Sequence, residues 1–399
     1  MIRFLRLSLF VVTLTVLFIS CNQDPTSVGS NLISEQDKFT FQQLNSDESN
    51  LFQKTSYFEE KPKLGGSEYI LLGKNPYSES SIMFRYQIYL PDTTLTRISN
   101  NEVIIKEAWM EMIPRYTIGD KASAFDFTVH QVRSAWTAPG FDRDSSKSEF
   151  LKYDADNVKF GLVVTDTTVK FHLKTDVIRE WFIYKKNSSA PKNNGIILKP
   201  GNTSKMLGFL AVQLNATYYE TYLHVILERP NYYKDTLVVA PDEDVHVVTR
   251  TSGFSAPVTS NFYLEGGYSL RGSLFFDLSS LPKTAIINKA TLELTVDESK
   301  ELDGNPKSDS IYVQLWGDST AHKLSGDSLS VSFISRKNNV FSGDISWAIQ
   351  KWLTGHVNEG LSLTLYDEYS SAARIAFYCS NNSNKTLRPK LKITYLQKK

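Results

Sequence analysis

The sequence predicts an all-β protein made of two tandem antiparallel β-sandwich domains of the jelly-roll type, each with one short helix. Apolar and polar residues alternate with period two in many short runs, as at Ala290, Leu292 and Leu294, which is the pattern of strands with one buried face. Clusters of Gly, Pro, Asn and Asp separate these runs, as in sandwich folds. Most of the runs also occur twice in the same order, about 190 residues apart.

The internal repeat sets the predicted domain boundaries. The matching blocks are residues 104–112 with 286–294, 176–182 with 346–353, 195–198 with 360–363, and 222–227 with 389–395. Because their order is preserved, duplication of one domain explains them better than chance. We therefore place domain 1 at residues 37–229 and domain 2 at residues 235–397.

The helix expected in each copy carries a Trp on its apolar face. Residues with helical spacing form this face, which consists of Ile345, Ile349 and Trp352 in domain 2 and of Val177, Ile178 and Trp181 in domain 1. Asp344 precedes the domain 2 helix and is a residue type that caps helices. We expect both Trp side chains to anchor the core rather than to bind a ligand.

The first 20 residues predict export. Arg3 and Arg6 precede an apolar run that is shorter than the roughly 20 residues of a membrane-spanning helix and is typical of a signal peptide. The run ends at Ser20 and Cys21, which resemble the bacterial lipobox. That resemblance implies cleavage before Cys21 and its lipidation, with several acyl chains for firm anchoring. The alternative is an ordinary secretory signal followed by a chance cysteine.

The residues after Cys21 predict the place of anchoring. Residues 21–36 are polar and are expected to form a flexible tether. Asn22 stands where an Asp would resemble the signal for retention in the inner membrane. We therefore expect a lipid-anchored protein of the cell envelope at the outer membrane, on its periplasmic or its surface face.

Composition and charge exclude several classes. The net charge is +1, so no basic face for nucleic acid is expected. Once Cys21 is lipidated, Cys379 is the only other cysteine, and an internal disulfide is excluded. The fold must therefore rest on its hydrophobic core.

Domain 2 resembles a known family through its core and turn residues. The resemblance rests on residues 274–282, 287–294, 352–361 and 388–391. These are similar to the DNRLRE-domain family of β-sandwich modules, some of which are carbohydrate-binding modules for acidic polysaccharides such as alginate. The resemblance implies a sandwich fold and a polysaccharide ligand. Domain 1 shares the pattern through the internal repeat, and it carries an insertion between Pro91 and Ile104.

Trp109 is the candidate sugar-binding residue. Its counterpart in domain 2 is Thr291, and Glu107 and Glu111 are its neighbours on the polar face of a predicted strand. An exposed Trp on a strand can stack on a sugar ring, and Arg115 and Tyr116 follow just beyond the strand as further candidates. The alternative is that the other domain or the insertion covers Trp109.

A metal site is a second possibility in the acidic turn of residues 297–304. Asp297, Glu301 and Asp303 supply oxygen ligands of the kind that Ca²⁺ prefers. A solvated turn without structural calcium is the interpretation that we favour, and no other cofactor is expected.

The sequence contains no catalytic motif. Its six His lack metal-ligand spacing, and there is no GxSxG motif or phosphate-binding loop. We therefore expect a non-catalytic, membrane-anchored lipoprotein that binds polysaccharide. One alternative is a structural or assembly lipoprotein with a protein partner in the envelope. Another is a polysaccharide-degrading enzyme, because paired catalytic carboxylates need closeness in space only.

Overall fold

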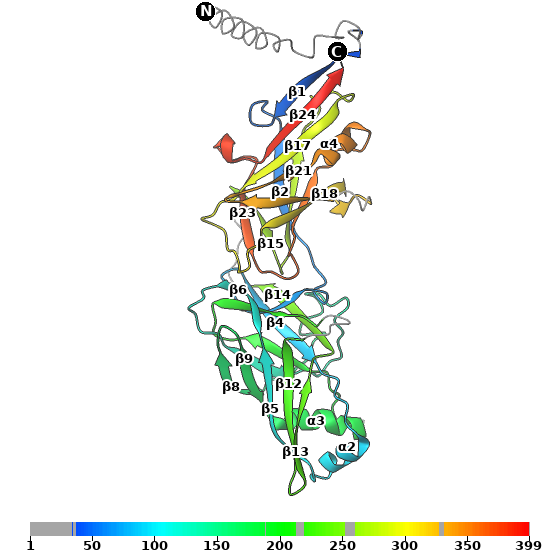
Figure 1. Cartoon of the computed structure of the whole chain (residues 1–399), viewed down its shortest axis with the longest axis vertical. Helices are drawn as coiled ribbons and strands as arrows, with labels where there is room; N and C mark the ends of the chain where they lie inside the picture. The colour runs from blue at the N-terminus through cyan, green and yellow to red at the C-terminus, as the bar shows by residue number, and fades with distance from the viewer. Residues whose placement is uncertain are drawn as a thin grey trace, which may run out of the picture.

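The computed structural model describes residue 34 and residues 37–187, 189–212, 219–251, 260–326 and 331–398. The predicted signal peptide and Cys21 lie outside these residues. Two units stack end to end along the long axis (Figure 1), and the predicted all-β class is confirmed. Within the described residues no helix has the length and apolarity needed to cross a membrane.

The first unit contains two sheets that enclose a core. Strands β3, β4, β6, β7, β10, β11 and β14 form the larger sheet, and β5, β8, β9, β12 and β13 form the smaller one. Their bounds are β3 (Tyr69–Lys74), β4 (Ser78–Arg85), β5 (Ile104–Met112), β6 (Pro114–Gly119), β7 (Phe127–Gln131), β8 (Lys159–Val164), β9 (Val169–Leu173), β10 (Ile196–Pro200), β11 (Lys205–Leu210), β12 (Thr221–Arg229), β13 (Tyr233–Val239) and β14 (Glu243–Arg250). Two helices, α2 (Asp92–Ser99) and α3 (Thr175–Lys186), belong to this unit.

The second unit is built on a single continuous sheet of twelve strands. Its strands are β1 (Phe39–Asn45), β2 (Gln53–Glu59), β15 (Asn261–Glu265), β16 (Leu270–Phe276), β17 (Ile286–Thr295), β18 (Ser310–Asp318), β19 (Lys323–Leu324), β20 (Val331–Lys337), β21 (Val340–Asp344), β22 (Leu361–Leu365), β23 (Arg374–Tyr378) and β24 (Lys390–Lys398). Helix α4 (Ser346–Leu353) and the 3-10 helix η3 (Lys385–Leu387) complete it.

Each unit is completed by two strands of the other repeat. Strand β1 pairs with β24 and β2 pairs with β16, although β1 and β2 begin the first repeat. Conversely, β13 pairs with β12 and β14 pairs with β4. Strands β4 and β16 occupy equivalent positions in their units. Strand β4 also pairs with β10, and β16 also pairs with β22, and β10 and β22 are matching strands of the two repeats. The two repeats therefore exchange their first two strands reciprocally.

This exchange differs from the predicted division of the chain. The predicted boundary between residues 229 and 235 separates the repeats in sequence, but residues 39–59 pair within the second unit and residues 233–250 pair within the first. A sequence repeat shows that two strands carry similar patterns of side chains. Because both repeats offer an equivalent strand edge, the pattern does not determine whether a strand pairs within its own repeat or with the other one.

The two units also share a hydrophobic core. One cluster of buried residues lies between the two sheets of the first unit, with Phe127 and Phe171 among its members. A second cluster runs from the outer face of the larger sheet of that unit, at Met83 and Val247, to Phe377 in the second unit. Continuous burial of this kind resists relative motion of the units.

The predicted helices are present, with one addition. Trp181 is buried in the core and Trp352 packs against the core of the second unit. The Asp344 carboxylate accepts a hydrogen bond from the backbone N–H of Ser346 at 2.8 Å, at the start of α4. The prediction of a single helix in the first repeat was wrong, because α2 forms within the insertion and buries Leu95 and Ile98.

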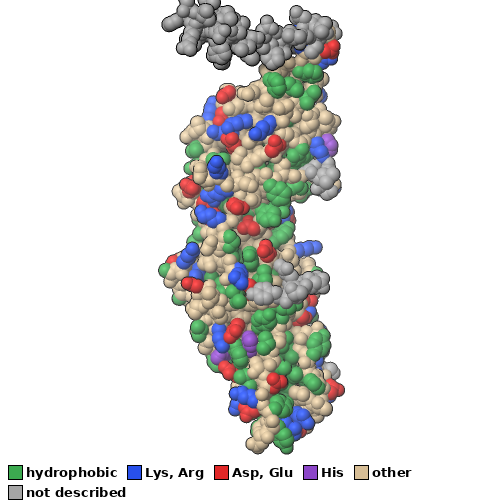
Figure 2. All heavy atoms as spheres, viewed as in Figure 1, with side chains coloured by type: hydrophobic (Ala, Val, Ile, Leu, Met, Phe, Trp, Pro, Cys, Tyr) green, Lys and Arg blue, Asp and Glu red, His purple; other side chains and the backbone are tan. Residues whose placement is uncertain are grey.

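Charged side chains of both signs are mixed on the face of the molecule that Figure 2 shows. On the face shown in Figure 2, basic and acidic side chains are interspersed along both units. This face carries no large area of one sign, as the net charge of +1 leads one to expect.

The exchange can be tested by disulfide trapping. Ser56 on β2 is directly opposite Ser273 on β16, and such pairs lie within disulfide range. We expect Ser56→Cys with Ser273→Cys to form an internal disulfide in soluble residues 22–399, detected by peptide mapping with mass spectrometry. The control pairs Ser56→Cys with Met83→Cys, the matching position on β4, and should stay reduced. A disulfide in the control alone would mean that each repeat folds on itself.

Two buried titratable side chains lie on strand β14. His246 is fully buried and neither ring nitrogen has a hydrogen-bond partner among the described residues. Burial lowers its pKa to about 3. Asp244 accepts a hydrogen bond from the backbone N–H of Val212 at 2.7 Å, but burial raises the pKa of its carboxyl to about 7.

These two groups predict opposite pH dependences of stability. The unfolded chain protonates His246 below about pH 6.5 while the folded chain does not, so stability falls from there toward pH 3. His246→Leu should therefore raise the unfolding free energy at pH 4.5, by about 2–3 kcal/mol beyond any gain at pH 8.

Asp244→Asn should instead raise the unfolding free energy at pH 8 and have little effect at pH 4, because ionisation of Asp244 destabilises the fold increasingly as the pH rises from about 3.8 to 7. Urea unfolding at each pH measures both, and an equal effect at both pH values would contradict the assignment.

Candidate functional site

Trp109 lies in a row of side chains that crosses the smaller sheet of the first unit. Strand pairing places Phe160, His172, Trp109, His224 and Val238 directly opposite one another on β8, β9, β5, β12 and β13. The ends of the row are the most exposed, with Phe160 54% and Val238 55% accessible. The row is therefore an aromatic surface of the type that the sequence led us to expect.

The ring of Trp109 nevertheless has close neighbours from the strands on both sides. His224, from the strand on one side, stacks on it at 4.7 Å between ring centroids and 4° between planes. Lys170, from the strand on the other side, places its Nζ 4.8 Å from the ring centroid. The indole N–H donates to Glu111 at 3.0 Å. These contacts with His224, Lys170 and Glu111 hold the ring within the sheet, so the geometry favours a packing role.

The polar groups of this face are also paired with one another. Glu111 lies 3.1 Å from Lys170 and 3.7 Å from His224, and Glu107 lies 3.4 Å from His172. Partial burial acts to raise the pKa of Glu111, but hydrogen bonds from Lys170 and Trp109 outweigh it, so the pKa lies below its usual range. Burial lowers the pKa of His224, against the attraction of Glu111. His224 is therefore neutral near pH 7.

Arg115 and Tyr116 lie away from Trp109. Arg115 forms a bidentate pair with the buried carboxylate of Glu220. Tyr116, on β6, is only 2% exposed, and its hydroxyl accepts a hydrogen bond from the backbone N–H of Ala372 in the second unit at 3.2 Å. Tyr116 thus lies at the junction between the units, and its position does not support the predicted role beside Trp109.

The three candidate calcium ligands have other partners. Glu301 forms a bidentate pair with Arg336, which also lies 3.4 Å from Asp303. Asp297 accepts hydrogen bonds from Ser299 and Asn261. In the described part of the chain no group of three or more His, Cys, Asp or Glu side chains could hold a metal ion. These pairings do not favour the calcium site that the sequence left open as a second possibility.

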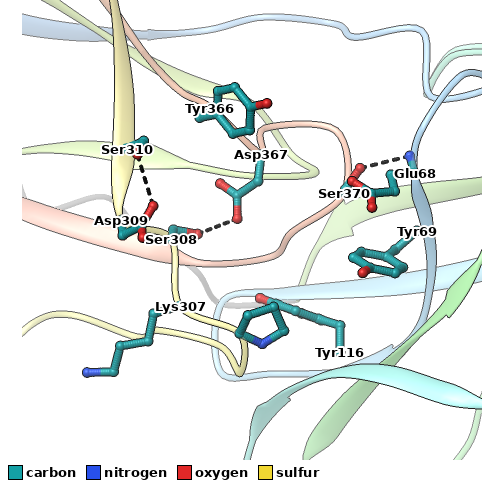
Figure 3. A pocket seen from close by; sticks show the side chains of 11 residues that line it. Glu68, Tyr69, Tyr116, Lys307, Ser308, Asp309, Ser310, Tyr366, Asp367 and Ser370 are labelled. Atoms are coloured by element: carbon teal, nitrogen blue, oxygen red, sulfur yellow. Dashed lines mark hydrogen bonds between the residues drawn. The ribbon is translucent and has the colours of Figure 1, made fainter. Parts of the chain in front are cut away.

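A pocket of about 190 Å³ lies where the two units meet. Its walls come from β3, β6, the segment before β18 and the turn after β22, and their residues are Glu68, Tyr69, Tyr116, Pro306, Lys307, Ser308, Asp309, Ser310, Tyr366, Asp367 and Ser370 (Figure 3). The backbone pairing of Thr117 with Asn305 closes one side, with N–H···O distances of 3.0 and 2.8 Å. We call this cavity the junction pocket.

Serine hydroxyls and carboxylates supply most of the polar lining of the junction pocket. Ser308 donates to one carboxylate oxygen of Asp367 at 2.6 Å, and Ser370 accepts from the backbone N–H of Glu68 at 2.9 Å (Figure 3). The other oxygen of Asp367, Oδ1, is buried without a hydrogen-bond partner among the described residues. Burial raises the pKa of Asp367, against hydrogen bonds from Ser308 and Ser371. Asp367 therefore has hydroxyl donors but no ion-pair partner among the described residues.

Three aromatic rings form a cluster that reaches the junction pocket through Tyr366. Tyr312 on β18 contacts Phe333 on β20 at 4.7 Å and Tyr366 at 5.3 Å between centroids, and Phe333 and Tyr366 are 5.9 Å apart. Phe333 is 52% exposed and Tyr366, which also lines the pocket, is 59% exposed. We call Tyr312, Phe333 and Tyr366 the aromatic trio. It presents apolar surface next to a polar cavity.

The sequence contained little that could have identified this site. Tyr312 and Tyr366 were visible as aromatic residues in strand-like runs, but the chain has many of these. Residues 68–69 and 306–310 are more than 200 positions apart, and only the packing of the two units brings them together.

Comparisons with known proteins add little to this picture. No family model matches the chain, and no curated protein matches it. Among solved structures, the C-terminal domain of the Streptococcus pyogenes antigen I/II-family protein AspA aligns over 88% of this chain and 92% of that chain. The sequence identity is 7% and the TM-score is 0.17, so this likeness carries no argument about fold or function.

The packing role of Trp109 predicts a loss of stability on its removal. Trp109→Ala eliminates the stack on His224 and the contact with Lys170, so we expect the unfolding free energy to fall by about 1–2 kcal/mol. Phe160→Ala, at the exposed end of the same row, should have a smaller effect. Urea unfolding of soluble residues 22–399 compares the two. An unchanged midpoint for Trp109→Ala would mean that the ring is free to serve a ligand.

Proposed function

We propose that this protein is a non-catalytic glycan-binding lipoprotein of the cell envelope and that the junction pocket with the aromatic trio is its binding site. The observation that supports the proposal is the position of three partly exposed aromatic rings beside a small cavity lined with hydroxyl and carboxylate groups. Because both units contribute residues to this site, the site can form only when the two units keep a fixed relative position.

The chemistry of the site suits a sugar. A pyranose ring has apolar C–H faces that pack on aromatic rings and a rim of hydroxyl groups that need donors and acceptors. The aromatic trio supplies the first kind of contact. Ser308, Ser310 and Asp367 supply the second, because hydroxyls donate and accept while carboxylates accept. Concave, partly apolar sites with a few convergent polar groups are the usual form of small-molecule sites.

The proposal also includes two expectations from the sequence, which are the lipid anchor at Cys21 and the jelly-roll-like fold of each unit. Each unit is taken as a jelly-roll-like, DNRLRE-like sandwich, completed here by exchanged strands. The predicted tether leads directly into β1, which pairs with the C-terminal strand β24 at the far end of the second unit (Figure 1). Lipidation of Cys21 would therefore attach the membrane to the second unit and hold the first unit farthest from it.

A protein partner in the envelope is the second candidate function, and one observation favours it. The loop of residues 135–151 in the first unit forms a cavity of about 490 Å³ whose lining includes Trp136, Phe141 and Phe150. Phe150 is 63% exposed. Exposed apolar cavities of this kind accept side chains of a binding partner.

Affinity electrophoresis of soluble residues 22–399 against a panel of neutral, basic and acidic polysaccharides tests the glycan proposal. We expect at least one polymer to retard the protein. Tyr366→Ala should raise the apparent Kd about tenfold, because stacking of one ligand ring on an aromatic side chain contributes about 1–3 kcal/mol. Tyr232→Ala is the matched control, because that Tyr is also exposed, at 73% against 59% for Tyr366, but lies at the β12–β13 turn of the other unit.

The same experiment distinguishes the competing interpretations. Retardation that is lost in Trp109→Ala but kept in Tyr366→Ala would move the site to the smaller sheet. Absence of retardation by every polymer, together with cross-linking of the intact protein to an envelope protein that Phe150→Asp abolishes, would replace the glycan proposal by the protein-partner one.

A further inference from the structure

We infer that the junction pocket receives a sugar unit that carries a free primary amino group, so that the preferred glycan is a deacetylated hexosamine polymer and not a uronate polymer such as alginate. This inference rests on the proposed function and names the ligand class of the same site. It follows from the charges of the pocket and from the way in which the rest of the junction treats its acidic side chains.

The charge of the junction pocket is negative. Glu68, Asp309 and Asp367 line it, and Lys307 is its only basic residue. Within the described chain none of the three carboxylates takes part in an ion pair. A uronate would bring a further negative charge into this cavity, and like charges at such short range are unfavourable. An ammonium group would bring the opposite charge.

Four other carboxylates at and around the junction differ from those of the pocket, because each of the four has an arginine. Arg271 binds Glu368 through two hydrogen bonds of 2.8 Å, and Arg250 binds the buried Glu265 at 2.7 Å. The further pairs are Arg336 with Glu301 and Arg115 with Glu220. A buried charge without a partner destabilises a fold. The chain meets this requirement at these four sites. Asp367, like the buried Asp244 on β14, has no ion-pair partner among the described residues, and Asp367 lines the junction pocket.

The position of Asp367 defines what the missing cation must do. Its Oδ2 accepts from Ser308, while Oδ1 is buried and has no partner in the described chain. Ser310 already donates to Asp309 at 2.9 Å, so its oxygen remains an acceptor. An ammonium group has three donors and no acceptor, so in the pocket it can lie beside the Asp367 carboxylate and donate to neighbouring hydroxyl oxygens. Burial raises the pKa of Asp367, and a bound cation would lower it.

The surroundings favour an amino sugar over the lysine side chain of a protein partner. The pocket, at about 190 Å³, is smaller than the roughly 300–1,000 Å³ of sites that enclose a drug-sized ligand, so it accommodates one small group. The aromatic trio continues from its mouth through Tyr366 to Phe333. A rigid chain of rings can place one amino group in the pocket and stack its next ring on the trio.

The test uses isothermal titration calorimetry of soluble residues 22–399 with three probes: chitosan oligosaccharides, their fully N-acetylated counterparts, and alginate oligosaccharides of similar length. In slightly acidic buffer we expect chitosan oligosaccharides to bind at least about tenfold more tightly than the acetylated ones, with no binding of alginate. The preference should weaken with added salt, because it is electrostatic.

Two variants assign the preference to the pocket. Asp367→Asn should reduce the affinity for chitosan oligosaccharides about tenfold and leave that for the acetylated ones unchanged. Asp309→Asn, at an exposed position of the same pocket, should reduce it in the same direction and guards against misfolding of the buried variant. Asp166→Asn, in an exposed turn of the first unit, removes the same charge and should change nothing.

The outcomes separate this inference from the function on which it rests. Equal affinity for both forms of the oligosaccharide, or tighter binding of alginate, overturns the amino-sugar assignment while glycan binding stands. Binding of no glycan, with Tyr366→Ala without effect in the electrophoresis, overturns both. Binding of a lysine-rich peptide that Asp367→Asn abolishes, without binding of any oligosaccharide, assigns the pocket to a protein ligand and also overturns the inference.

Discussion

The reciprocal exchange of strands between the two repeats is the constraint on which the rest of the structure depends. Strands β1 and β2 complete the second unit, and β13 and β14 complete the first. The chain therefore crosses between the units twice, and neither unit has its full set of strands without the other repeat. A shared core at Met83, Val247 and Phe377 adds to this coupling. The junction pocket can exist because both of its walls are held in one position.

Electrostatics at the junction follow from the same arrangement. Joining two units brings acidic side chains of one close to the other, and burial makes an unpaired carboxylate costly. Arginines compensate Glu265 and Glu368. Asp367 has no ion-pair partner among the described residues, and with Glu68 and Asp309 it lines the junction pocket.

The surface around Trp109 shows why residue type alone is a weak guide to a binding site. The sequence correctly placed Trp109 on the outer face of a strand between Glu107 and Glu111. Whether the ring is available depends on its cross-strand neighbours, and those come from β9 and β12, some 60 and 115 positions away in the chain. His224 stacks on the ring and Lys170 lies 4.8 Å from its centroid. Tyr116, proposed as its companion, is turned into the junction instead.

The sequence by itself determined the local structure: the all-β class, the alternation that buries Ala290, Leu292 and Leu294 on β17, the helices α3 and α4, and the duplication. These depend on side-chain periodicity, which is a local property. Tertiary structure alone decided which repeat each of β1, β2, β13 and β14 completes, that Tyr116 is buried, and that Tyr366 and Asp367 share a pocket with Glu68. Equivalent strand edges have nearly the same local pattern, so the choice between them depends on the fit of the two units as a whole.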